Sequence, residues 1–352
     1  MPAQAQGVTL PSRAGPRHRS ARLADNLRMA DRTDSTPSIS CVMPAYNEAG
    51  NLGRFVPQVL AALKTLSPQV EVVIINDGSR DQTAAAAIEL TRQHPEVVLL
   101  DLSRNFGKEA ALTAGMEAAR GEVVVLMDSD GQHPVELIGQ MLARWRQGMD
   151  VVYAVRKTRD DQTRLHAKLA GVFYWLVNHN NRVKIPPNAG DFRLMDRAVV
   201  AAIKSLPERN RFMKGLYAWV GFNSTALEYE PLPRTDGQSS FGLRGAASLA
   251  LTGLVAFSSV PLRTLALLGL LISLASLSYG LWVVISYFVY GIDVPGYATL
   301  AAGMMLLSGI QILSIGVLAE YIGRIYEEVK RRPTYLLKGR HGQGLPPAGP
   351  EA

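Results

Sequence analysis

The chain has 352 residues, of which 47% are apolar and 19% charged, and a formal net charge of +7. This length and apolar content supply enough nonpolar side chains for a folded core, which excludes a chain that is disordered throughout. A single cysteine, Cys41, excludes an internal disulfide and fits a reducing compartment. The net positive charge suits a protein that lies against anionic lipid or handles phosphates. No nucleic-acid partner is expected.

Residues 1–36 are rich in Arg, Ser, Pro and Ala and lack the apolar run of a secretory signal. We predict a disordered basic tail here. Contact between its arginines and lipid is the alternative.

Residues 37–235 predict one α/β domain. Short apolar runs alternate with helical patterns, and the runs cover Ile39 to Pro44, Val70 to Asn76, Val97 to Leu102, Val123 to Met127 and Val151 to Val155. This alternation is typical of a Rossmann-like, mostly parallel sheet with helices on both faces. Ligands of such sheets bind beyond the carboxyl ends of the strands, so functional side chains are expected directly after these runs.

The residues that follow three of these runs are strongly polar. They include Asn47 and Glu48 after the first run, Asp77 after the second, and Asp128 and Asp130 after the fourth. The chain contains no G-x-G-x-x-G after the first strand and no G-x-x-x-x-G-K-[ST], which weakens dinucleotide oxidoreductase and P-loop interpretations.

Asp128 and Asp130 lie two positions apart at the end of an apolar strand, which is electrostatically costly unless a cation joins them. Mg²⁺ or Mn²⁺ is the natural partner, because either ion shares its coordination shell with the phosphates of a nucleotide diphosphate. A turn whose Asp residues cap the next helix is the alternative. The neighbouring His133 is expected at a helix start or on the surface, since no helical histidine partner accompanies it.

Two long segments near the C-terminus, Thr264 to Ile292 and Val294 to Ala319, contain no charged residue. Each exceeds the roughly 20 residues of a membrane-spanning helix. We predict transmembrane helices over 263–291 and 295–320, joined as a hairpin, with an interfacial helix over 236–262 before them. A third span over Gly245 to Leu262 is the alternative.

Basic residues flank this hairpin on both sides, whereas its tip has no Lys or Arg. The positive-inside rule therefore places the large domain and both termini, including a C-terminal helix and tail over 321–352, in the cytoplasm. The sequence predicts an integral protein of a plasma membrane or bacterial inner membrane. A homo-oligomer is compatible with the Gly- and Ser-containing second span, which can equally pack against its own hairpin partner.

From about Ser38 to Pro333 the chain resembles the family-2 inverting glycosyltransferases of GT-A fold, in particular the polyprenyl-phosphate (bactoprenol or dolichyl-phosphate) sugar transferases. Seven motifs carry the resemblance: Pro44-Ala45-Tyr46-Asn47-Glu48, Asn76-Asp77-Gly78-Ser79, Asn105-Phe106-Gly107-Lys108, Asp128-Ser129-Asp130, Gly190-Asp191-Phe192-Arg193, Glu208-Arg209-Asn210-Arg211-Phe212 and Glu320-Tyr321-Ile322-Gly323-Arg324. The resemblance implies that Glu48 and Asp77 hold the nucleoside and that Asp128, Asp130 and Gln132 hold diphosphate and metal. It adds Pro44, Tyr46, Asn47, Lys108 and Asp128 to the nucleotide-binding set, and Asp128, Asp130, Asp191 and Arg193 form the catalytic set.

The resemblance also implies a polyisoprenyl phosphate acceptor, whose phosphate oxygen is a ready nucleophile because its second pKa is about 6. Four cationic residues before the apolar segments are predicted to bind that phosphate: Arg193, Arg209, Arg211 and Lys214. A charged helix start at Glu208 to Arg211 is the alternative. Asp191 is predicted to orient an arginine, while contact with sugar hydroxyls or action as a base stay open.

The predicted function is inverting, metal-dependent transfer of a hexose, glucose from UDP-glucose, to undecaprenyl or dolichyl phosphate. Alternatives are another sugar (mannose, GlcNAc, GalNAc or an amino-arabinose derivative) and a non-catalytic scaffold that binds sugar nucleotides. A processive polysaccharide synthase is disfavoured, because Gln140 to Trp145 is one residue too long for the Q-x-x-R-W motif and two spans are too few for a polymer channel.

Overall fold

The computed structural model describes residues 32–33, 35–157, 189–209, 211–232, 260–290 and 296–346. Residues 236–259 of the predicted interfacial helix, the tip of the predicted hairpin and most of the predicted basic tail lie outside these ranges.

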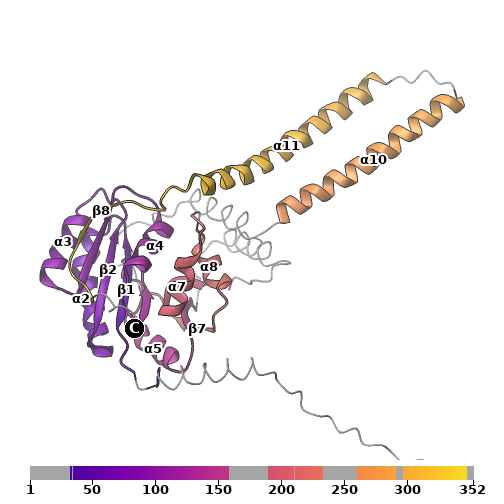
Figure 1. The fold of residues 1–352 in the computed structure, drawn as a ribbon. Coiled ribbons are helices and arrows are strands. Elements are labelled where there is room, and N and C mark those ends of the chain that lie inside the picture. The colour runs from indigo at the N-terminus through magenta and orange to yellow at the C-terminus, as the bar shows by residue number, and fades with distance from the viewer. Residues whose placement is uncertain are drawn as a thin grey trace, which may run out of the picture.

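In the described part of the chain, eight strands form one sheet in the order β7-β5-β6-β4-β1-β2-β3-β8 (Figure 1). The five predicted strands are all present, as β1 (Ile39–Ala45), β2 (Val70–Asn76), β3 (Val97–Leu102), β4 (Val123–Leu126) and β5 (Val151–Arg156). Strands β4, β1, β2 and β3 are neighbours and pair in parallel. The predicted fold class, a mostly parallel α/β sheet followed by a helical hairpin, is confirmed.

Helices cover both faces of the sheet, and each face has its own apolar core. One core packs alternate residues of β1, such as Cys41 and Met43, against α2 (Ala49–Leu66), α3 (Thr83–Gln93) and α5 (Leu137–Arg146). The other packs Val42 and its neighbours against α4 (Lys108–Ala118), α7 (Arg197–Ser205) and α8 (Met213–Trp219). Burial on both sides explains why these strands are continuous apolar runs.

Three strands were not among the five predicted ones: β6 (Ala189–Asp196), β7 (Ser224–Tyr229) and β8 (Leu337–His341). Strand β6 lies between β4 and β5 and is antiparallel to both. Strand β8 adds to the other edge, antiparallel to β3. The sheet is therefore mixed, and its inserted strand carries Asp191 and Arg193 into the middle of the domain.

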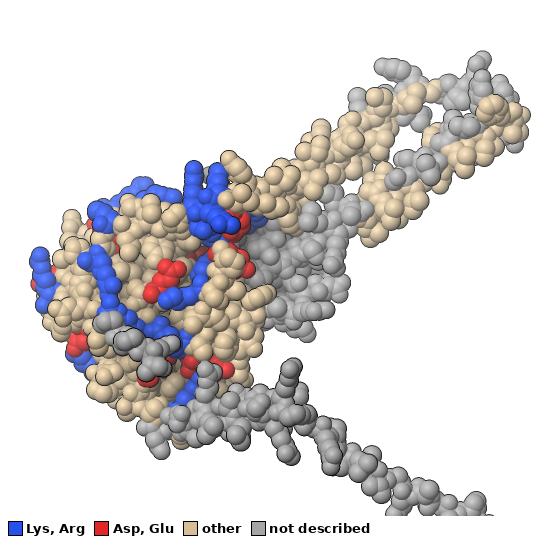
Figure 2. Space-filling model, in the orientation of Figure 1, with Lys and Arg blue, Asp and Glu red and all other residues tan. Residues whose placement is uncertain are grey.

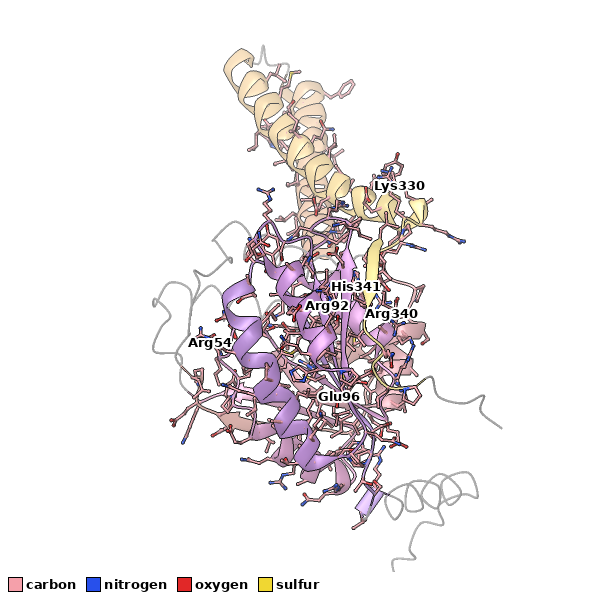
Figure 3. The ribbon with its side chains drawn as sticks, turned by 90° about the vertical axis from the view of Figure 1, so that its left-hand side faces the viewer. Arg54, Arg92, Glu96, Lys330, Arg340 and His341 are labelled. Atoms are coloured by element: carbon pink, nitrogen blue, oxygen red, sulfur yellow. The ribbon has the colours of Figure 1, made fainter. Side chains whose placement is uncertain are left out.

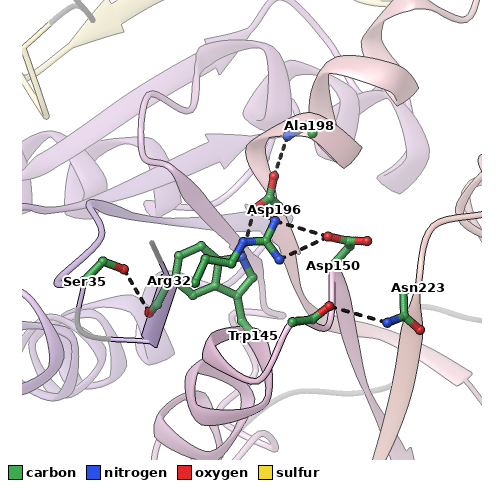
Figure 4. A network of polar contacts seen from close by, with 8 residues as sticks. Arg32, Ser35, Trp145, Asp150, Asp196, Ala198 and Asn223 are labelled. Carbon is green, nitrogen blue, oxygen red and sulfur yellow. Dashed lines mark hydrogen bonds and ion pairs between the residues drawn. The ribbon is translucent and has the colours of Figure 1, made fainter. Parts of the chain in front are cut away.

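Arg32, counted in the predicted tail, lies against the folded domain (Figure 4). Its guanidinium pairs with Asp150 at 3.1 Å and with Asp196 at 2.6 Å, and lies over the ring of Trp145. Asp196 also caps α7 through the backbone N–H of Ala198 and accepts the indole N–H of Trp145. The folded region therefore extends to Arg32.

Two long helices, α10 (Val260–Tyr290) and α11 (Tyr297–Lys330), project from the domain side by side (Figure 1). Their described apolar side chains are largely exposed, with Phe288 at 81% and Ile312 at 71%. Among the described residues, Leu306–Lys330 has the length and composition of a membrane span, and an 18-residue window of it has a mean hydropathy of 1.6. Exposed apolar surface of this extent needs lipid or protein to cover it.

The chain returns from α11 to the domain through β8, which begins beside the carboxyl end of β3: Leu337 pairs with Leu102. Figure 3 shows Lys330 at the end of α11 next to the domain, and Arg340 and His341 farther along the domain edge. Lys and Arg side chains gather on the domain where it meets the hairpin (Figure 2). The carboxyl edge of the sheet, where ligands are expected, thus lies on the side of the hairpin.

Candidate active site

The loops after β1 and β2 are tied together by hydrogen bonds. The backbone N–H of Asn47 donates to Ser79 Oγ at 3.0 Å, and Asn47 Oδ1 accepts the N–H of Arg80 at 2.9 Å. The N–H of Glu48 donates to Thr83 Oγ1 at 2.8 Å. Asn47 has φ 57°, a left-handed conformation that Asn tolerates better than most residues. These bonds hold Asn47 and Glu48 at the carboxyl edge of the sheet, called the rim below. The sequence predicted a nucleoside contact there.

Asp77 joins the loop after β2 to the loop after β3. Its carboxylate accepts the backbone N–H groups of Phe106 at 2.7 Å and Gly107 at 2.9 Å. Burial raises the pKa of Asp77, and these two hydrogen bonds oppose the rise. Between the loops, Gly78 has φ 60°, and a Cβ there would lie 2.2 Å from the carbonyl carbon of Arg104, so the close approach requires glycine.

Three predicted site residues meet in one ion cluster. Lys108 Nζ lies 2.6 Å from Asp128 Oδ1 and 2.9 Å from Asp191 Oδ2, which joins the loops after β3 and β4 to β6. Burial opposes the charge of Lys108, but the two carboxylates raise its pKa overall. Burial likewise opposes the charge of Asp191, and Lys108 and Lys214 lower its pKa below the usual range. Lys108 and Asp191 are therefore ionised at neutral pH.

The Asp128-to-Gln132 loop is fixed from several sides. Ser129 Oγ donates to the carbonyl of Pro44 at 3.0 Å, and Asp130 Oδ1 accepts the N–H of Gln132 at 3.0 Å. Arg156 Nη2 donates to Gln132 Oε1 at 3.3 Å. Arg156 was not singled out from the sequence, because it ends a strand followed by further charged residues and carries no motif.

The prediction that His133 lies at a helix start or on the surface is wrong, because the residue is buried, with 4% exposure, and α5 begins four residues later at Leu137. Its ring stacks on Phe192 with centroids 4.5 Å apart, and Nδ1 accepts the backbone N–H of Asp128 at 3.3 Å. Burial lowers the pKa of His133. The neutral imidazole therefore supports the loop that carries Asp128.

The residues predicted to hold a divalent cation, Asp128, Asp130 and Gln132, offer two carboxylates and one amide oxygen. Among the described residues, no group of three or more His, Cys, Asp or Glu side chains is arranged to hold a metal ion. Two carboxylates and an amide do not make an all-protein cage, but they fit Mg²⁺ or Mn²⁺, which completes its shell with water and substrate phosphates. The ammonium of Lys108 beside Asp128 shows that this position accepts a cation.

Arg193, two residues after Asp191 on β6, is buried, with 3% exposure. Its Nη2 donates to the carbonyl of Gly190 at 2.6 Å, and its guanidinium lies 3.4 Å from the ring centroid of Tyr217. Within the described part of the chain, Arg193 Nε and Tyr217 Oη have no hydrogen-bond partner. Such buried donors are suited to an anionic ligand, because leaving them unpaired is costly.

The other three predicted phosphate-binding residues lie on α8 and in the segment just before it. Lys214 is on α8, and its charge acts on Asp191 and Glu109. Arg209 contacts the C-terminal end of the hairpin: its N–H donates to Glu328 at 2.9 Å and its guanidinium to the carbonyl of Arg332. Arg211 donates to the carbonyls of Glu208 and Leu206 at 3.0 Å each. Arg209 is thus held against the domain end of α11, whereas Arg211 bonds to carbonyls of its own segment.

Glu109 belongs to the same cluster but was not predicted as a site residue, because on the sequence it is an ordinary first-turn glutamate. Its carboxylate accepts the N–H of Met213 at 3.0 Å. Burial first, and then the charge of Asp191, raise the pKa of Glu109 from 4.5 to about 7. Only the folded environment reveals this proton site.

Glu109→Gln is expected to make stability less dependent on pH. Between pH 4.5 and about 7 the folded wild type binds more protons than the unfolded chain, so its unfolding free energy falls as pH rises through this window. Glutamine mimics the protonated form and should stabilise the protein by roughly 2 to 3 kcal/mol above pH 7, with no gain below pH 4.5. Thermal midpoints of both proteins in detergent from pH 4.5 to 8.5 measure this, and a constant difference would contradict it.

A mostly parallel α/β sheet with an Asp-x-Asp loop after β4 is typical of glycosyltransferases of GT-A architecture. The glycosyl transferase family 2 profile matches residues 40–203, and the GtrB C-terminal hairpin profile matches residues 260–325. The chain belongs to glycosyl transferase family 2 and is a glycosyltransferase.

The relatives match almost the whole chain. An uncharacterised glycosyltransferase of Synechocystis sp. is 44% identical over 87% of this chain and 96% of its own length. An SfII prophage-derived bactoprenol glucosyl transferase of Shigella flexneri is 44% identical over 86% of this chain and 98% of its own length. Among solved structures, mannosyl-3-phosphoglycerate synthase from Rubrobacter xylanophilus has 18% identity and a TM-score of 0.43, over 67% of this chain and 77% of that one. The hairpin match and the exposed apolar helices indicate a membrane-associated enzyme.

Proposed function

We propose that this enzyme transfers glucose from UDP-glucose to a polyisoprenyl phosphate, with inversion, at the cytoplasmic face of a membrane. The observation that carries the proposal is the position of two charge clusters on one edge of the domain. The acidic loop with Asp128 and Asp130 lies at the carboxyl end of β4, and Arg209 contacts Glu328 at the domain end of the hairpin. The bactoprenol glucosyl transferases among the relatives support this acceptor and this sugar.

In this proposal, Glu48, Asn47 and Asp77 contact the nucleoside, together with Pro44 and Tyr46 of the same rim, and Lys108 binds the diphosphate. Asp128, Asp130 and Gln132 would hold Mg²⁺ or Mn²⁺, which would neutralise charge on the departing diphosphate. Arg193, Arg209, Arg211 and Lys214 attract the acceptor phosphate, whose oxygen needs no strong general base at neutral pH.

The transfer assay uses purified full-length protein in detergent with Mg²⁺, undecaprenyl phosphate and a panel of radiolabelled nucleotide sugars. Label from UDP-glucose should enter the lipid phase, and analysis of the linkage should show a β-glucoside formed from the α-linked donor. Label from UDP-GlcNAc, UDP-GalNAc, a GDP-mannose or a UDP-amino-arabinose donor instead would correct the sugar. Failure with every donor would favour the scaffold alternative and contradict the proposal.

Asp191→Asn is expected to reduce turnover by roughly 10-fold without abolishing it. Asp191 was predicted to orient an arginine, whereas the ion pair seen among the described residues is with Lys108 at 2.9 Å, which also suits an orienting role. Loss of a general base would instead cost about 10² to 10⁴-fold. Turnover at saturating acceptor separates the two roles. Complete loss of turnover there would refute the orienting role.

A further inference from the structure

The acidic cluster already contains a positive charge that belongs to the protein. Lys108 Nζ lies 2.6 Å from Asp128 Oδ1 and 2.9 Å from Asp191 Oδ2, and this is the neutralisation that close carboxylates require. The Lys108 and Asp128 side chains are 35% and 30% exposed, so solutes reach this pair, whereas Asp191 is 16% exposed. The ammonium thus occupies the accessible side of a carboxylate proposed to serve a divalent cation.

The backbone before Lys108 is attached to the proposed nucleoside site. Lys108 begins α4 directly after Gly107, which has φ 95°. The N–H groups of Gly107 and Phe106 both donate to the Asp77 carboxylate, at 2.9 and 2.7 Å. A ligand that engages Asp77 therefore acts on the segment that positions the ammonium. The lysine stem has four rotatable bonds, so its head group can move between anions without a change of fold.

We propose that Lys108 is a built-in counter-ion that competes with the divalent metal for Asp128 until the donor arrives. This inference rests on the metal-dependent function proposed above. Without donor, the ammonium neutralises Asp128 and Asp191 and repels a second cation. The donor diphosphate offers Lys108 an alternative anion and gives the metal further oxygen ligands, so metal and nucleotide bind with positive coupling. Lys108 is a positioning residue for the metal site in this scheme.

The test measures Mn²⁺ binding by electron paramagnetic resonance of the free ion, with full-length protein and no acceptor. Each protein is titrated without nucleotide and with saturating UDP. Lys108→Gln should raise the nucleotide-free Mn²⁺ affinity by about 10-fold or more and reduce the enhancement by UDP. Lys108→Arg retains the charge and should stay near wild type.

Lys214→Gln is the matched control, because it removes one positive charge whose field also acts on Asp191. It should change the nucleotide-free Mn²⁺ affinity by less than about 3-fold. Equal increases for Lys108→Gln and Lys214→Gln, or no increase for Lys108→Gln while UDP-dependent Mn²⁺ binding persists, would overturn this inference and leave the proposed function intact. Absence of Mn²⁺ binding to every protein even with UDP would overturn both the inference and the metal requirement.

Discussion

Asp130→Ala is expected to reduce sugar transfer by roughly 1,000-fold or more, because several kcal/mol of charge stabilisation on the leaving diphosphate would be lost. Asp130 lies two residues after Asp128, and alanine would also remove the hydrogen bond that its carboxylate accepts from the N–H of Gln132. The initial rate of label transfer to the lipid at saturating Mg²⁺ measures the effect.

The control for Asp130→Ala is Glu136→Gln, which removes a negative charge from an exposed position just before α5. Its activity should stay within about 2-fold of wild type, as expected for a screened surface charge. Asp130→Asn separates shape from charge: it keeps an oxygen for the Gln132 N–H and should be nearly as inactive as Asp130→Ala. Activity of Asp130→Asn close to wild type would contradict a metal ligand at this position.

The strands that could be predicted from the sequence are those buried on both faces. Every residue of β2 is buried, and its run from Val70 to Ile75 is apolar except for Glu71. Such runs need no knowledge of their neighbours to be recognised. The rim residues were predictable for the same reason, since the end of a buried strand fixes which polar residues reach the carboxyl edge.

Strands β6 and β8 could not be predicted because their stability comes from tertiary pairing. Asp191 and Arg193 place charges in a central strand, and those charges are compensated by Lys108, from another segment, and by contact with Tyr217. Strand β8 has one large apolar residue, Leu337, and is held by its pairing with β3 and by the Lys338–Asp101 ion pair at 3.3 Å. Local patterns contain neither contact.

The site residues likewise divide into those that local sequence predicted and those that only tertiary contacts revealed. The sequence grouped Asp128 with Asp130 but gave no sign that Lys108 would bridge Asp128 to Asp191, because three different segments supply the cluster. The burial of His133 likewise depends on Phe192 of β6. Motifs therefore predicted which residues form the site, and only the fold revealed which of them neutralise one another.

Arg193→Lys is expected to lower kcat/KM for the lipid phosphate by about 100-fold, since charge-assisted hydrogen bonds contribute about 1.5–3 kcal/mol each. Lysine keeps the charge but loses the planar fork that can bind a phosphate with two parallel hydrogen bonds. Arg193 Nε is buried without a hydrogen-bond partner in the described part of the chain, so this donor would gain a partner if the acceptor phosphate entered the site. The KM for the donor sugar should change little.

The matched control for Arg193→Lys is Arg197→Lys, four residues along the same segment. Arg197 donates through both Nη atoms to the carbonyl of Ala119 at 2.9 Å, so the same replacement there also removes a forked contact. Both variants should lose thermal stability, but only Arg193→Lys should lower kcat/KM for the lipid phosphate. Arg197 contacts a backbone carbonyl at the C-terminal end of α4, away from the proposed acceptor site. Equal kinetic losses in the two variants, or a loss confined to the donor KM, would show that Arg193 supports the fold or the donor site and does not bind the lipid phosphate.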